Sequence, residues 1–181
     1  MKNKKMNIIK YILLLLLFAC GNNNEKIKNE ITKNTLEKDL AKYEDIWNRF
    51  LAGDTTVANE DNFDKNVVVV TAQGDLIGIE AVKNFYMNYL NGFSNIEFTI
   101  LDAFGQGDRI VKHWNFKGTH TGVFFGIPPT GNKLDLSGTT LVTMKDGKIA
   151  KEQDFFDMQS LILQLQQPSD ENVVVDDYTG I

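Results

Sequence analysis

The stretch that decides the fold is RIVKHWNFKGTH at residues 109–120, in which side chains alternate in character from His113 onward. Successive side chains of a β-strand point to opposite faces of a sheet. One face of this strand therefore carries Trp114, Phe116, Gly118 and His120. The other carries His113, Asn115, Lys117 and Thr119. The first set is aromatic and poor in charge, so we expect it to face the interior of the protein.

A second strand pair follows, at about 134–144 and 148–156, joined by Asp146-Gly147. Asp-Gly between two apolar runs is a strong signal for a tight hairpin turn. This turn places Thr140 nearly opposite Asp154. Its direct partner on the last strand is expected to be Gln153 or a residue one step away. Along the last strand, one face is shared by Ala150, Glu152, Asp154 and Phe156. The pattern leaves open which face of this strand points inward.

The segments before these strands alternate between helical and extended periods. Helical spacing of apolar residues predicts helices at about 34–52, where Asn34 is a candidate cap, at 79–90 and at 157–166, capped by Asp157. Further strands are expected at 67–71, 76–77 and 95–104. Val173-Val174-Val175 is a candidate additional strand. Helices followed by a run of strands predict an α+β domain, in which helices cover one face of a bent antiparallel sheet.

The N-terminus combines four lysines within residues 1–10 with an apolar run at 11–19 that is too short for an ordinary spanning helix. This is typical of a secretory signal peptide, here residues 1–19. Leu17-Phe18-Ala19-Cys20 resembles the lipobox of bacterial lipoproteins. The resemblance implies that Cys20 carries lipid, with residues 20–33 as a flexible tether, and locates the domain in the cell envelope, on the periplasmic or the surface side. The alternatives are an uncleaved membrane anchor and a general secretion signal with an incidental cysteine.

Charge and composition exclude several classes of function. Loss of four lysines with the signal peptide takes the formal net charge from −5 to −9 (−5 minus 4), so nucleic acid is not an expected partner. Neither a Walker-type nor a dinucleotide-binding glycine loop is present, and no cofactor is expected. No metal site is expected either, because the two histidines, His113 and His120, fall on opposite strand faces.

Two longer segments, WNFKGTHTGVFFGIPPTG at 114–131 and DGKIAKEQDFFDMQSLILQLQQP at 146–168, carry a family resemblance. Their GTHTG, GIPPTG, DGKI and FFD motifs are similar in order and spacing to the SnoaL-like, or ester-cyclase-like, branch of the nuclear-transport-factor-2-like superfamily. The resemblance implies a SnoaL-like domain at 34–168, followed by an acidic tail at 169–181. It also implies a cone-shaped fold, with helices packed on a curved antiparallel sheet and an apolar pocket between them.

Polyketide cyclases of this branch close a ring by aldol condensation, with an Asp on the last strand as acid/base and no cofactor. Asp154 matches that Asp. The His that those cyclases carry fourteen residues earlier is Thr140 in this chain, and the Trp that often precedes the Asp is Gln153. A carboxylate on an apolar wall near an imidazole could serve as a general acid/base, so Asp154 and His120 are the candidate catalytic residues.

These considerations predict one cavity to which Asp154, His120 and Trp114 contribute, with helix aromatics as its other wall. The candidate ligand-binding residues are Trp47, Phe85, Tyr89, Trp114, Phe124, Thr140 and Phe156. The expected function is binding of a small, largely apolar molecule by a membrane-anchored domain. The alternatives are a cofactor-free enzyme of the cyclase, isomerase or hydrolase type that uses Asp154, and a non-catalytic interaction module, for example a homodimer.

Overall fold

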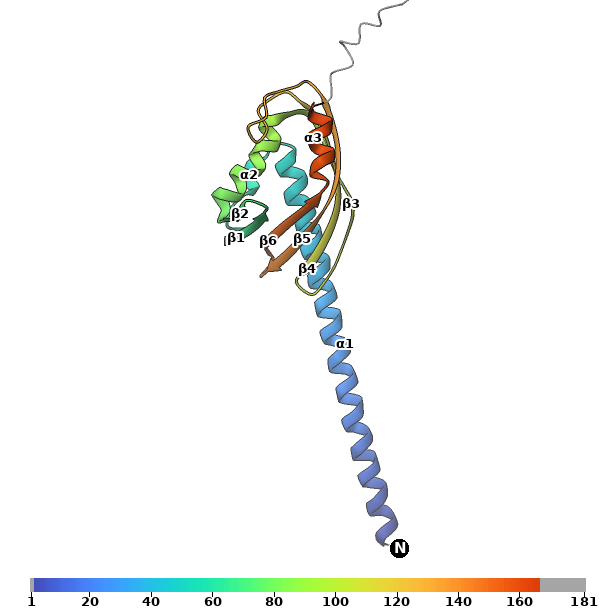
Figure 1. Cartoon of the computed structure of the whole chain (residues 1–181). Coiled ribbons are helices and arrows are strands. Elements are labelled where there is room, and N and C mark those ends of the chain that lie inside the picture. The colour runs from blue at the N-terminus through green and yellow to red at the C-terminus, as the bar shows by residue number, and fades with distance from the viewer. Residues whose placement is uncertain (1, 167–181) are drawn as a thin grey trace, which may run out of the picture. The chain divides into compact units, whose positions relative to one another are not determined.

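The computed structural model describes residues 2–166, and the side chains of 25–166 (Figure 1). Its elements are α1 (Lys2–Leu51), a short 3-10 turn (Thr55–Val57), β1 (Phe63–Thr71), β2 (Gly74–Ile77), α2 (Ile79–Gly92), β3 (Phe93–Gln106), β4 (Arg109–His120), β5 (Lys133–Lys145), β6 (Lys148–Phe156) and α3 (Met158–Gln166). The chain divides into two units, Met1–Lys38 and Asp39–Ile181. The acidic tail and the candidate strand at 173–175 lie outside the described residues.

The first unit corrects the expected start of the first helix. Residues 21–33 are helical and continuous with the rest of α1, so the helix does not begin at Asn34. No proline interrupts this stretch, and extending an existing helix costs far less than starting a new one. The Thr32 and Thr35 hydroxyls also donate hydrogen bonds to carbonyls one turn back. Among the residues whose side chains are described, no helix is long and apolar enough to cross a membrane.

The second unit has the predicted α+β architecture. Six strands form one curved sheet in the order β2-β1-β6-β5-β4-β3, and helices cover one of its faces (Figure 1). The pairs β3–β4, β4–β5 and β5–β6 are antiparallel, as expected. The pair β1–β6 is parallel, so the sheet is mixed. Sequence periodicity did not indicate this pairing, because the two strands are far apart in the chain.

The helices present aromatic faces to the sheet. Residues 39–51 of α1 bury Tyr43, Trp47 and Phe50, and α2 buries Tyr86 and Tyr89. The remaining boundaries follow the expected ones closely, and the Asp157 carboxylate caps α3 by accepting a hydrogen bond from the Ser160 amide at 3.0 Å.

Candidate functional site

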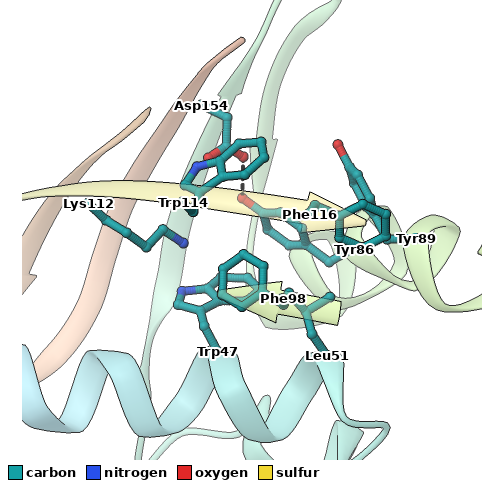
Figure 2. A pocket seen from close by; sticks show the side chains of 9 residues that line it. All are labelled: Trp47, Leu51, Tyr86, Tyr89, Phe98, Lys112, Trp114, Phe116 and Asp154. Carbon is teal, nitrogen blue, oxygen red and sulfur yellow. Dashed lines mark hydrogen bonds between the residues drawn. The ribbon is translucent and has the colours of Figure 1, made fainter. Parts of the chain in front are cut away.

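A cavity of about 40 Å³ lies between the helices and the concave face of the sheet (Figure 2). Its walls come from the end of α1, from α2 and from strands β3, β4 and β6. They are formed by Trp47, Leu51, Tyr86, Tyr89, Phe98, Lys112, Trp114, Phe116 and Asp154. Seven of these nine side chains are aromatic or aliphatic, so the cavity is a largely apolar space that two charged groups enter.

Asp154 on β6 is held by hydroxyl groups from two directions. The Tyr86 hydroxyl donates to its Oδ2 at 2.9 Å, and the Thr140 hydroxyl donates to its Oδ1 at 2.5 Å. Trp114 Nε1 in turn donates to Thr140 Oγ1 at 3.0 Å. Thr140 pairs with Asp154 in the β5–β6 register, as the hairpin turn predicted. These contacts fix the carboxylate at the cavity wall between α2 and β5.

The Trp114 ring has its place because Gly138 lies opposite it in the β4–β5 register. A Cβ atom on Gly138 would overlap the six-membered part of the indole. The absence of a side chain at that position lets the ring lie flat on the neighbouring strand. Trp114 Nε1 then reaches Thr140, two residues further along β5.

Glu152 lies two residues before Asp154 on β6 and is fully buried. Its Oε1 accepts hydrogen bonds from the Tyr43 hydroxyl at 2.6 Å and from Trp47 Nε1 at 3.0 Å. Its Oε2 has no hydrogen-bond partner among the described residues. Burial raises the pKa of Glu152 to about 7, although nearby Lys112 acts to lower it. The group therefore changes charge near neutral pH.

Lys112 on β4 is 4% exposed, which is rare for a lysine. Its Nζ lies 5.0 Å from the ring centroids of Tyr43 and Trp47 and 5.3 Å from that of Phe98. Burial lowers the pKa of Lys112, while Glu152 and Asp154 act to raise it. A cation among aromatic faces is stabilised by their quadrupoles, but less well than by a carboxylate in contact.

The tyrosines of the site act as hydrogen-bond donors. Burial, reinforced by the neighbouring carboxylates, raises the pKa of Tyr43 and of Tyr86 well above the ordinary value, and burial also raises that of Tyr89. All three hydroxyls therefore keep their protons over the physiological range. They can donate hydrogen bonds but cannot act as general bases at neutral pH.

His120 is not at this cavity, which corrects the expectation of one shared site. It lies on the same face of β4 as Trp114, but six residues further on, or about 20 Å along a strand. There its ring is fully buried beside Phe93 and Phe124. Nδ1 is 3.1 Å from Thr130 Oγ1. Burial lowers the pKa of His120, and the Gly122 backbone opposes this in part.

The other candidate residues divide into two groups. The cavity is lined by Trp47, Tyr89 and Trp114 together with Asp154. Thr140 does not line it but donates a hydrogen bond to Asp154. Phe85, Phe124 and Phe156 do not line it. They pack against lining residues instead, since Phe85 contacts Tyr86, Phe124 contacts Tyr89 and Phe156 contacts Trp114.

Sequence reasoning missed Lys112 and Glu152 as site residues. Lys112 stands two positions before Trp114, so the same alternation that placed Trp114 inside also places Lys112 inside. Glu152 shares a strand face with Asp154, but its burial depends on the helices that cover it. Among the described residues, no three His, Cys, Asp or Glu side chains are grouped as metal ligands.

Three helices on a curved, mostly antiparallel sheet, with an apolar cavity between the layers, make up the nuclear-transport-factor-2-like fold, which solved structures share. Residues 40–165 match the SnoaL-like polyketide cyclase family. The chain belongs to this family.

Several solved structures share this fold. A candidate SnoaL-like polyketide cyclase from Jannaschia sp. CCS1 is 20% identical, with a TM-score of 0.68 over 74% of this chain and 94% of that chain. IdmH, a candidate polyketide cyclase from Streptomyces antibioticus, is 20% identical, with a TM-score of 0.60 over 70% and 97%. AclR, a candidate hydroxylase from Streptomyces galilaeus, is 18% identical, with a TM-score of 0.63 over 74% and 85%. No protein of curated function matches the chain.

Proposed function

We propose that this protein binds a small, largely apolar molecule with a ring system in the cavity between its helices and its sheet. The observation that carries the proposal is the composition of the wall: aromatic rings from α1, α2, β3 and β4 surround a few fixed polar groups. Ligand sites typically combine an apolar lining with a small number of placed polar atoms. The cavity has room for only a few waters, at about 10–15 Å³ of such volume each. A ring-sized ligand must therefore displace the half-buried Leu51 and Phe98.

Binding can be tested with an internal probe, because Trp47 and Trp114 are the two tryptophans of the chain. Both line the cavity, and each indole N–H makes a hydrogen bond there. We expect 2-acetonaphthone, a neutral bicyclic ketone, to shift both indole N–H resonances saturably in a ¹H–¹⁵N NMR titration. Trp114→Phe assigns the two signals. If neither signal moves, and protein isolated from its own organism carries no small molecule in native mass spectrometry, the binding proposal fails.

A second candidate function is proton transfer by Asp154, favoured by its place at the cavity wall. Its carboxylate accepts two hydroxyl hydrogen bonds and keeps further lone pairs for a substrate proton. If Asp154 is a general base, the protein should accelerate exchange of the 2-acetonaphthone methyl protons in D₂O, measured by ¹H NMR. Asp154→Asn keeps the side-chain volume and should abolish this exchange while changing the free energy of unfolding by less than about 1 kcal/mol. A binder without catalysis gives the uncatalysed rate in both proteins.

We further propose that lipid on Cys20 holds the domain on a membrane of the cell envelope. The basic start, the short apolar run and the placement of the single cysteine support this. Cys20→Ser should convert a detergent-phase protein into one that partitions with water or remains unprocessed. Unchanged partitioning of the serine variant as an acylated protein would rule out this lipid.

A third function, docking of a partner or of a second copy, is favoured by the outer face of the sheet. Phe104, Val111 and Leu141 form a row across β3, β4 and β5 on the face opposite the helices. Phe104 is 58% exposed and Leu141 is 37% exposed. Sedimentation of the protein beside a Phe104→Lys variant tests for a homodimer. A dimer that dissociates in the variant supports docking, and a monomer in both proteins argues against self-association.

A further inference from the structure

Lys112 is the group in the cavity that the binding proposal leaves unexplained. Figure 2 shows its side chain extending from β4 towards the space between the rings of Trp47 and Trp114. It is 4% exposed and lies over three aromatic rings. Within the part of the chain that the structure describes, its Nζ forms neither a hydrogen bond nor an ion pair. A buried ammonium with three unused donors faces the ligand space.

Neither nearby carboxylate forms an ion pair with Lys112, although Glu152 Oε2 has no hydrogen-bond partner among the described residues. Glu152 accepts from Tyr43 and Trp47 through one oxygen, and Asp154 accepts from Tyr86 and Thr140. Both act on Lys112 through space without contacting it. Burying a charge is costly unless it is paired and hydrogen-bonded, and cation–π contacts replace only part of its hydration. Packing alone would be served as well by methionine, so a lysine here is best explained by a partner that arrives from outside.

We propose that Lys112 binds an anionic oxygen of the ligand, such as a carboxylate, so that this protein selects acidic ring compounds. The inference rests on the proposed binding function and names the class of ligand. The acidic group would lie at the β4 wall against Nζ, with the ring system against Trp47, Tyr89 and Trp114. Asp154 and the Tyr86 hydroxyl, on the α2 side of the cavity, would then face the opposite end of the molecule. Burial, which lowers the pKa of Lys112, makes the unliganded ammonium less stable and so favours an arriving anion.

The test compares two probes of nearly equal shape, 2-naphthoate and 2-naphthamide, in the indole N–H titration at pH 7. Charge-assisted hydrogen bonds are roughly twice as strong as neutral ones, so we expect the acid to bind about tenfold or more tightly than the amide. Lys112→Met keeps the length and apolar stem of the side chain and should reduce this ratio to about one. Lys151→Met, at an exposed position on β6, is the matched control and should leave the ratio unchanged.

The outcomes separate the inference from the function beneath it. If 2-acetonaphthone and both naphthalene probes bind alike and Lys112→Met changes no ratio, binding stands and the selection of acids is overturned. If none of the three binds, the selection of acidic ring compounds is overturned, and the binding function falls with it if protein from its own organism also carries no small molecule in native mass spectrometry. The comparison within the wild-type protein remains decisive even if Lys112→Met does not fold, which circular dichroism would reveal.

One further result would overturn the proposal in favour of covalent chemistry. A neutral Lys112 amine could attack the carbonyl of 2-acetonaphthone and form an imine with loss of water. Borohydride would reduce that imine to a stable secondary amine, visible as a mass increase on the peptide that contains Lys112. We expect no such adduct, because an ammonium that binds an anion is protonated and is not a nucleophile.

Discussion

Lys112 and His120 lie on the same face of β4, eight residues apart, and their surroundings differ in kind. Lys112 stands among Tyr43, Trp47 and Phe98, within the influence of two carboxylates. His120 is enclosed by Phe93 and Phe124, with one hydroxyl contact from Thr130. Strand alternation assigns both to the interior. The two residues are about 26 Å apart along the strand. What each can do depends on which helices and loops cover its end of β4.

The contrast extends to the pH dependence of stability. Glu152 at the cavity and His120 at the other end of β4 change the free energy of unfolding with pH in opposite directions. The raised pKa of Glu152 means that the folded protein binds a proton between pH 4.5 and about 7 where the unfolded chain does not. This stability is fully present below pH 4.5 and is lost as the pH rises towards 7. The lowered pKa of His120 acts in the other direction, because its contribution is lost as the pH falls below 6.5.

The largest expected effect is therefore that of Glu152→Gln. At 1.36 kcal/mol per pKa unit, the shift from 4.5 to about 7 corresponds to about 3 kcal/mol of stability lost across that range. The amide keeps an acceptor for Tyr43 and Trp47 but does not titrate. Urea unfolding at several pH values should show a falling profile in the wild type and a flatter one in the variant. Equal slopes in both proteins would mean that the pKa of Glu152 is the same in the folded and the unfolded protein.

A pair of glycines sharpens the comparison at the level of packing. Gly138 lies under Trp114 at the cavity end, and Gly118 lies under Phe93 at the His120 end. Gly138→Ala should cost about 1–3 kcal/mol of unfolding free energy, because the new methyl group overlaps the indole and moves it. Gly118→Ala should cost less, since its Cβ would stand 3.0 Å from Phe93 Cβ and needs only a small shift. Thermal melts give the order, and only the first change should shift the Trp114 indole N–H resonance.

The smallest effect is the titration of His120 itself. Its burial predicts a pKa below 6.5, read from the ring proton resonances as the pH is lowered. His120→Gln identifies the signal by its loss. The same variant should leave the acid-to-amide binding ratio at the cavity unchanged, because His120 is not among the lining residues. A change in that ratio would place the two ends of β4 in one functional unit after all.

The sequence by itself determined the α+β class, the order of helices and strands, the inward face of β4 and the pairing of Thr140 with Asp154. These features depend on periods of two and 3.6 residues and on a local turn, all of which are encoded within a few neighbouring residues. The same alternation along β4 also indicated that Lys112 faces inward. The predicted start of α1 at Asn34 was wrong. A helix can extend past the turns that pack on the sheet without carrying a further apolar face.

Only the tertiary structure decided which inward residues share one cavity. Residues on one strand face can be 20 Å or more apart, and sequence spacing does not say which end a helix covers. The burial of Glu152, the parallel pairing of β1 with β6 and the separation of His120 from Asp154 all depend on contacts between distant segments. The charge properties of the site follow from those contacts, since desolvation and Coulomb interactions act through space and not along the chain.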